Sequence, residues 1–273
     1  MLYISQRNQL LANKVVHTNS DIMYAGVVAG NNTGEAWVDD LSDPAFCMVW
    51  SEYLSGFHFM GTCCEHINGG RLRAFIDGVI VPFLKGKGVD SFAFSCDHRA
   101  WFLIICEMLP HEMKKGKQYV FRLMDKSHVN TELILPIGYE MLELNMGFAS
   151  GELARMENYG AIHTEIEKTW GCIDKFLELG KGFVAVCDGV ICGFASTHMR
   201  YKYTYSFGTE IYNTHKRKGL SSFLTMTLLG AVISESADVW WDCGEGNVAS
   251  QKTAQKVGLT FSHEYEIGWF DIK

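Results

Sequence analysis

The chain has 273 residues, of which 48% are hydrophobic and 20% charged, and its formal net charge is −7 at pH 7. This length exceeds the usual size of one compact core, so we expect two domains, and the apolar content excludes a disordered chain. The negative charge excludes a general electrostatic affinity for nucleic acid, which depends on clustered lysine and arginine.

The first residues, MLYISQRNQLLANKVVH, lack the basic segment, apolar run and small-residue cleavage site of a secretory signal. No apolar stretch approaches the ~20 residues that span a bilayer. We therefore expect a cytoplasmic protein without a membrane partner. Nine cysteines are scattered without the paired spacing of a zinc site, so we expect buried reduced thiols and no metal.

The first domain is expected over residues 1–130. Apolar side chains recur at helical spacing across residues 70–85, which predicts an amphipathic helix that Pro82 ends or kinks. A strand at 91–95, a helix at 98–109 and a strand at 118–124 follow, which predicts a small α/β unit. Its role is left open between a lid over a pocket of the second domain, a homodimer interface and a degenerate duplicate of the second domain.

A polar stretch at 124–136 places the domain boundary near residue 130, and the second domain is expected over residues 131–273. A strand at 139–145 opens it, and a helix at 165–179 ends at Gly180. Two β-rich runs then flank Asp188-Gly189, which predicts a tight hairpin because both residues tolerate positive φ. A long strand at 201–211 follows.

The segment 219–234 carries apolar residues at i, i+3, i+4, i+7 and i+8, which predicts a helix that packs one face on a sheet. A buried strand at 239–243, a short helix at 248–257 and closing strands at 259–261 and 265–270 complete the chain. This order of elements predicts a second domain of the α/β (α+β) class.

The densest cationic segment, residues 215–218, directly precedes Gly219 at the start of the predicted helix. The first N–H groups of a helix have no internal partners, and the helix dipole adds about half a positive charge there. Gly219 lets a phosphate approach the main chain. Together with Lys216, Arg217 and Lys218, these groups predict a diphosphate site.

A second element follows the next strand, with Asn247-x-x-Ser250 and then Lys256-x-Gly258-Leu259. For Asn247 the alternative is a helix N-cap. Together with Lys216-x-x-Gly219-x-Ser221, this element resembles the motifs of the GNAT (GCN5-related) N-acetyltransferase superfamily, and the likeness covers about residues 133–273. The segments 208–210, 218–220 and 241–243 are most similar to the two-domain bacterial group that includes zwittermicin resistance acetyltransferases.

The resemblance implies a mixed sheet, flanked by helices, that splays between the strand ending near Ile211 and the strand 239–243, with the pantetheine arm of acetyl-CoA in the gap. It also implies transfer of the acetyl group to a primary amine of a small molecule by direct attack in a ternary complex. The implied cofactor-binding residues are Thr209, Glu210, Ile211, Tyr212, Lys216, Arg217, Lys218, Gly219, Leu220, Ser221, Ser222, Asn247 and Ser250.

The catalytic groups are less completely implied, because Ala254 stands where many family members have the tyrosine that protonates the departing thiolate. A thiol with a pKa of about 8.5 is a fair leaving group without a proton donor. Tyr203, Tyr205 and Tyr212 are candidate replacements, although an aromatic stripe in a strand is more often packing than catalysis. Glu210 and Glu245 are the candidate general bases, since an amine with a pKa of about 10 attacks only when unprotonated. The alternative is a non-catalytic CoA-binding or interaction protein with an eroded site.

Overall fold

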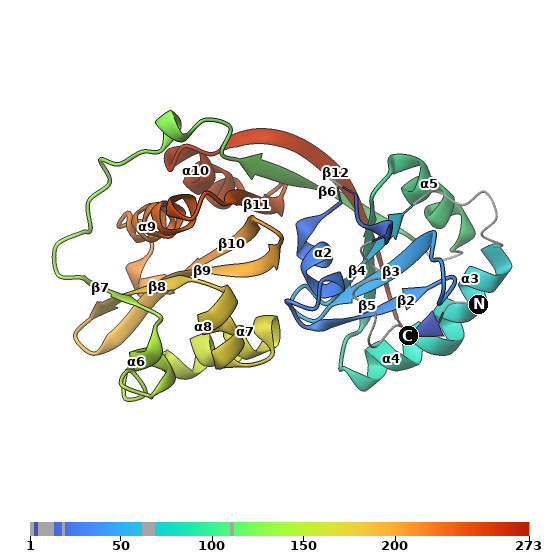
Figure 1. Cartoon of the computed structure of the whole chain (residues 1–273), viewed down its shortest axis with the longest axis horizontal. Helices are drawn as coiled ribbons and strands as arrows, with labels where there is room; N and C mark the ends of the chain where they lie inside the picture. Colours follow the sequence, from blue (N-terminus) through green and yellow to red (C-terminus); the bar gives the residue numbers. More distant parts are fainter. Residues whose placement is uncertain (1–2, 5–13, 18–19, 62–68, 110–111, 273) are drawn as a thin grey trace. The chain divides into compact units, whose positions relative to one another are not determined.

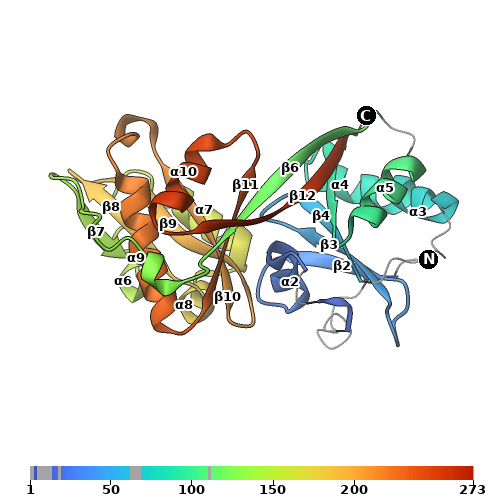
Figure 2. The same cartoon turned by 90° about the horizontal axis from the view of Figure 1, so that it is seen from above.

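The computed structural model describes residues 3–4, 14–17, 20–61, 69–109 and 112–272 (Figure 1). The chain divides into two compact units, the first formed by Met1–Gln118 with Glu264–Lys273 and the second by Tyr119–His263. Strands β6 (Lys114–Arg122) and β12 (Thr260–Asp271) each belong partly to both units, and they lie side by side (Figure 2). The two units are not consecutive halves of the chain with one boundary near residue 130, because the end of β12 pairs with β5 (Ser91–Cys96) of the first unit.

The sheet of the first unit has the strand order β1 (Tyr3–Ile4), β2 (Gly34–Val38), β3 (Phe46–Ser51), β4 (Gly56–Gly61), β5 (Ser91–Cys96) and β12. The pairs β2–β3 and β3–β4 are antiparallel, whereas β4–β5 is parallel. Aromatic side chains dominate its core, among them Trp37, Phe46, Trp50, Phe57 and Phe59, all nearly inaccessible to solvent. Its helices include α2 (Ile22–Val28) and α5 (Arg99–Met108).

The helix expected at 70–85 is confirmed, and Pro82 does not end it. The segment runs from α3 (Gly69–Phe75) through a π-helical turn, η1 (Ile76–Ile80), into α4 (Val81–Gly86). Leu72, Ile76, Ile80 and Leu84 are its buried residues in the apolar core. Pro82 stands in the first turn of α4, where its missing N–H is tolerated, and the wider turn before it lets the helix continue.

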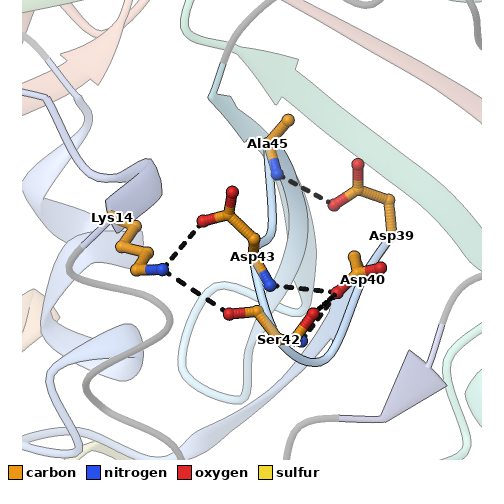
Figure 3. A network of polar contacts seen from close by, with 6 residues as sticks. All are labelled: Lys14, Asp39, Asp40, Ser42, Asp43 and Ala45. Atoms are coloured by element: carbon orange, nitrogen blue, oxygen red, sulfur yellow. Dashed lines mark hydrogen bonds and ion pairs between the residues drawn. The ribbon is translucent and has the colours of Figure 1, made fainter.

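The turn between β2 and β3 is built from carboxylates (Figure 3). One oxygen of Asp40 accepts hydrogen bonds from the Ser42 hydroxyl at 2.5 Å and from the Asp43 N–H at 2.9 Å, which lowers the pKa of Asp40 to about 2. The Asp43 carboxylate in turn pairs with the Lys14 ammonium at 2.8 Å. These contacts explain a tight acidic turn, since each carboxylate satisfies turn N–H groups or a cation.

The sheet of the second unit has the order β6, β11 (Asp238–Gly244), β10 (Thr204–Ile211), β9 (Val190–Tyr201), β8 (Gly182–Cys187) and β7 (Glu140–Glu143). The pairs from β7 to β10 are antiparallel, and β10–β11 is parallel. Helices α9 (Leu220–Ser234) and α10 (Val248–Lys256) cover one face, and α6 (Met146–Ala149), α7 (Tyr159–Trp170) and α8 (Ile173–Leu179) cover the other (Figure 1). The expected mixed, open sheet flanked by helices is confirmed.

The expected hairpin is also confirmed, with Asp188 and Gly189 at φ of 50° and 77° between β8 and β9. Three other expectations are wrong. The helix expected at 165–179 is two helices, because Gly171 adopts φ of 88° and ends α7. The strand expected from residue 201 starts at Thr204, since Lys202 turns the chain at φ of 53°, and the two expected closing strands are the single strand β12.

The described residues hold seven cysteines, and none of them forms a disulfide. Cys47, Cys96, Cys192 and Cys243 are buried as expected, whereas Cys106 and Cys187 are partly exposed and Cys172 is exposed; Cys63 and Cys64 lie outside the described residues. Within the described ranges, no group of three or more histidine, cysteine, aspartate or glutamate side chains is placed to hold a metal ion. None of the described helices has both the length and the apolar character needed to cross a bilayer.

Candidate functional site

Strands β10 and β11 separate partway along their length. Their parallel ladder joins Thr204, Tyr205 and Ser206 to residues 238–240 and ends there, although β10 continues to Ile211 and β11 to Gly244. Main-chain groups on the facing edges of the two strands consequently lack a strand partner in this stretch, as at the edge of a sheet. The expected splay is present in the structure.

The two faces of β10 meet different helices. Tyr205, Phe207 and Ile211 lie in the core beneath α9, and the Thr209 hydroxyl bonds Thr225 of that helix at 2.9 Å. Because side chains alternate along a strand, Ser206, Gly208 and Glu210 lie on the opposite face, the face of α7. Among the predicted cofactor residues of β10, Thr209 and Ile211 therefore have only their main chain free for a ligand in the gap.

The basic loop after β10 passes through the short helix η3 (Asn213–His215) and reaches α9 through two residues with positive φ, Arg217 at 62° and Gly219 at 88°. Gly219 is the N-cap of α9, and no side chain caps this helix end. The N–H groups of Leu220, Ser221 and Ser222 follow it in the first turn, where a helix offers no internal acceptor. A Cβ on Gly219 meets no atom within 4 Å, so the space before the helix end is open.

The three predicted cations of this loop differ in their surroundings. The Lys218 ammonium donates a hydrogen bond to the Tyr139 hydroxyl at 3.0 Å, and this bond raises the pKa of Lys218. The same hydroxyl lies 2.8 Å from Nδ1 of His215, so Tyr139 ties the loop to the start of β7. Lys216 and Arg217 are exposed, and no ion pair with the described residues engages them.

The second predicted element lies close to the first. Asn247 caps α10 by accepting the Ser250 N–H at 3.1 Å, which confirms the helix-cap interpretation of this residue. The Ser250 hydroxyl accepts a hydrogen bond from the Trp241 indole at 3.0 Å. Ser221 at the start of α9 bonds Thr253 of α10 at 3.4 Å. The structure thus brings the two motifs together at one end of the sheet.

The predicted catalytic residues are not equally placed. Glu210 and Glu245 are both exposed, and Glu245 stands in the turn after β11, where its carbonyl accepts a bond from Gln251. Ala254 is fully buried in the core, so position 254 offers no group to the gap. The Tyr212 hydroxyl is buried and has no hydrogen-bond partner among the described residues. Burial raises the pKa of Tyr212, and the charges of Glu210 and Glu165 raise it further.

Sequence reasoning missed two residues on this face. Nε2 of His198, on β9, lies 3.1 Å from Oε1 of Glu165, on α7. The two residues are 33 positions apart and neither belongs to a motif, so only the packing of α7 on the sheet brings them together. The one signal in the sequence is a histidine inside the otherwise uncharged strand segment 190–199.

The model of the GNAT acetyltransferase family matches residues 13–267. The chain is similar in structure to a GCN5-related N-acetyltransferase-like protein from Streptococcus suis 89/1591, with a TM-score of 0.68 and 16% identity over 96% of this chain and 98% of that chain. It is also similar to a tandem GNAT protein from the clavulanic acid biosynthesis pathway, with a TM-score of 0.58 and 11% identity over 99% and 98% of the two chains. An acetyltransferase from Colwellia psychrerythraea gives 0.55 and 9% over the full length of both. No curated protein matches the chain.

Proposed function

Because the chain belongs to the GNAT acetyltransferase family, we propose that it transfers the acetyl group of acetyl-CoA to a primary amine of a small molecule, by direct attack in a ternary complex. The observation that carries this proposal is the parallel strand pair β10–β11, which opens after Ser206 and leads to the uncapped start of α9. This arrangement combines free strand edges for an extended amide chain with a helix end for a diphosphate.

The diphosphate of the cofactor would bind the N–H groups of Leu220, Ser221 and Ser222 in the open space before Gly219. Lys216 and Arg217 would supply exposed positive charge there, and Lys218 supports the loop through Tyr139. The pantetheine amides would pair with the main chain of residues 209–212, as an added strand does. Asn247 and Ser250 would face the arm from the side of β11.

The chemistry requires a free amine, a polarised thioester and an acceptable leaving group. A main-chain N–H of β10 would bind the thioester oxygen, on which negative charge develops in the transition state. Tyr212 is the proposed donor to the thiolate, and its raised pKa keeps the hydroxyl protonated at neutral pH. Glu210 and Glu245 remain the proposed bases from the sequence, and both are exposed enough to exchange protons with solvent.

The test is calorimetric titration with acetyl-CoA and with CoA of the wild type, Gly219→Asp and Gly219→Asn. The two variants have isosteric side chains, both tolerate positive φ, and both enter open space. We expect saturable wild-type binding, near-wild-type affinity for Gly219→Asn, and at least about tenfold weaker binding for Gly219→Asp, which corresponds to about 1.4 kcal/mol of repulsion from the diphosphate.

Equal binding by the two variants would mean that the diphosphate lies elsewhere. A folded wild type that binds neither compound would instead support the alternative, an interaction protein with an eroded site. A wild type that binds acetyl-CoA but releases no CoA thiol with any of a panel of amines would support a non-catalytic CoA-binding protein.

A further inference from the structure

Four polar side chains meet on the face of β10 that is turned away from α9. They are Glu165 on α7, His198 on β9, Glu210 on β10 and Tyr212 directly after β10. In the pair Glu165–His198, Oε1 lies 3.1 Å from Nε2, and burial raises the pKa of the Tyr212 phenol, to which the charges of Glu210 and Glu165 add. The pairing of the strands alone does not bring these four side chains together.

His198 is held rigidly against the sheet. Its side chain is 6% exposed, and its ring lies directly on Gly208, where a Cβ would stand 1.6 Å from Cε1 of the imidazole. The Glu165 side chain is 26% exposed and therefore remains accessible from solvent. The imidazole is consequently fixed against the sheet, with the accessible Glu165 carboxylate at ion-pair distance from it.

The charges on this face are not balanced within the described part of the chain. Glu165 pairs with His198, and among the described residues neither Glu165 nor Glu210 forms an ion pair with a lysine or an arginine. The Tyr212 hydroxyl next to them is buried without a partner. A buried hydroxyl without a hydrogen-bond partner destabilises the fold, so a ligand that supplies hydrogen bonds and positive charge would stabilise this arrangement.

We propose that this face is the acceptor subsite, and that it selects an amine carrying a second positive charge. The inference rests on the acetyl transfer proposed above, names its substrate class, and places the base at Glu165 rather than at Glu210 or Glu245. Glu165 binds the reacting ammonium together with the Tyr212 hydroxyl, His198 is the positioning residue for Glu165, and Glu210 pairs with the second cationic group.

The step balances with these groups. Glu165 takes one proton from the ammonium, and the freed electron pair of nitrogen forms the bond to the acetyl carbon. The bond from carbon to sulfur breaks with its electron pair on sulfur, and the second proton lost by nitrogen neutralises the thiolate through Tyr212. Glu165 then returns its proton to solvent, for which its partial exposure suffices.

The substrate class is tested with three acceptors of nearly equal length, 1,4-diaminobutane, 4-amino-1-butanol and 4-aminobutyrate, by following release of CoA thiol. We expect kcat/KM for the diamine to exceed that for the amino alcohol by about tenfold, because only the diamine forms a hydrogen-bonded charge pair with Glu210. The amino acid should have the lowest kcat/KM of the three. In Glu210→Gln the diamine and the amino alcohol should become nearly equal. A preference for 4-aminobutyrate would overturn the proposal.

The base is tested with Glu165→Gln and His198→Gln, with Glu167→Gln as the matched control on the same helix. Glu167 is exposed and pairs with His163, away from the subsite. We expect Glu165→Gln to lower kcat by about 100-fold or more and to remove the acidic limb of its pH profile. His198→Gln should raise the acceptor KM and lower kcat by less than Glu165→Gln does, whereas Glu167→Gln should leave both unchanged.

Calorimetry separates this inference from the proposed function. Acetyl-CoA should bind wild type and Glu165→Gln with equal affinity, and 1,4-diaminobutane should bind the acetyl-CoA-free wild type more tightly than either Glu165→Gln or Glu210→Gln. Unchanged diamine affinity in both variants would overturn the subsite while the transferase proposal stands. Absence of acetyl-CoA binding alone would overturn the transferase proposal but not the diamine site.

Discussion

The absence of a side chain at Gly208 determines how the polar residues of the second unit pack on this face of the sheet. An imidazole occupies the position of the missing side chain, and the same imidazole holds Glu165. No local pattern marks this glycine in the sequence as different from those in turns. The basic loop and the helix cap could be predicted because each depends on neighbouring residues, whereas the Glu165–His198 pair depends on how a distant helix packs.

Replacement of Gly208 by alanine should displace His198. The added methyl group would overlap the ring, and overpacking of this kind costs about 1–3 kcal/mol. We expect urea unfolding to show a loss in this range, together with loss of acetyl transfer. Gly246→Ala is the control, because no atom lies within 4 Å of its Cβ position. Equal stability of the two variants would contradict the contact between His198 and Gly208.

A buried network in the first unit contains a second histidine–carboxylate pair. Nε2 of His58 lies 3.0 Å from Oδ1 of Asp97, and its Nδ1 lies 2.7 Å from the Ser95 hydroxyl. Oδ2 of Asp97 accepts bonds from the Ser20 hydroxyl and the Gly61 N–H, both at 3.0 Å. Burial tends to raise the pKa of Asp97, but His58 and the other donors outweigh burial, so its pKa is lowered.

This lowered pKa predicts how acid affects the fold. Asp97 stabilises the folded chain above its unfolded pKa of about 3.9, and this contribution is lost as pH falls through the lower folded pKa. We expect Asp97→Asn to be less stable than wild type by about 2 kcal/mol or more at pH 7, with the difference shrinking below about pH 4. Urea unfolding at pH 7 and at pH 3 measures both values.

Asp21 provides the control of opposite sign. Burial raises the pKa of Asp21, so its ionisation costs stability as pH rises above the unfolded value. Asp21→Asn should therefore be more stable relative to wild type at pH 7 than at pH 3. If both variants changed stability in the same direction with pH, the opposing pKa shifts would be wrong.

Among the helices, α9 combines two glycines with opposite roles. Gly219 starts the helix at φ of 88°, whereas Gly230 lies inside it, and neither has an atom within 4 Å of its Cβ position. Because space is equal at both sites, backbone conformation alone distinguishes them. Gly230→Ala should stabilise the protein by about 0.5–1 kcal/mol through lower entropy of the unfolded chain.

Gly219→Ala should destabilise it by about 1 kcal/mol, because alanine is strained at positive φ. Thermal unfolding of the two variants beside wild type measures both changes. A lower melting temperature for Gly230→Ala would show that α9 is not a regular helix at that position.

Most elements of the second unit could be predicted because their apolar periodicity is local. The helix 219–234 and the Asp188-Gly189 hairpin were predicted from spacing and turn residues, and the structure confirms both. The break at Gly171 could not be read from apolar spacing, since Trp170 and Phe176 continue one apolar pattern across it. The strands of the first 61 residues escaped prediction because both faces of β3 and β4 are buried and their sequences show no alternation.

At the scale of the whole chain, the two units share one order of elements. In the second, antiparallel strands β8, β9 and β10 are followed by α9 and then by β11 parallel to β10. In the first, β2, β3 and β4 are followed by the helical run α3–α4 and then by β5 parallel to β4. This repetition supports the proposal that the N-terminal domain, expected over residues 1–130, is a duplicate of the acetyltransferase domain expected over 131–273.

The duplicate differs at the place where the second unit opens. Pairing of β4 with β5 continues from Phe57 to Phe59, and the Asp97 N–H bonds the Phe59 carbonyl at 3.0 Å beyond the last paired residue. The Asp97 carboxylate then accepts the Gly61 N–H, so the main chain at the end of β4 is occupied. A pantetheine arm that needs free strand edges finds none between these described residues, and we propose that the first unit is a degenerate copy.

One molecule of acetyl-CoA should therefore bind per chain. Calorimetric titration of wild type should give a stoichiometry of one, and Gly219→Asp should weaken this single event at least about tenfold rather than remove half of the signal. Asp97→Asn removes the carboxylate charge that binds the main chain at the end of β4. If this variant folds, its stoichiometry should stay at one, because the hydrogen-bonded pairing of β4 with β5 remains. Two binding events in wild type, one of them surviving Gly219→Asp, would show that the first unit also accepts the cofactor, because a site in the second unit alone cannot saturate twice.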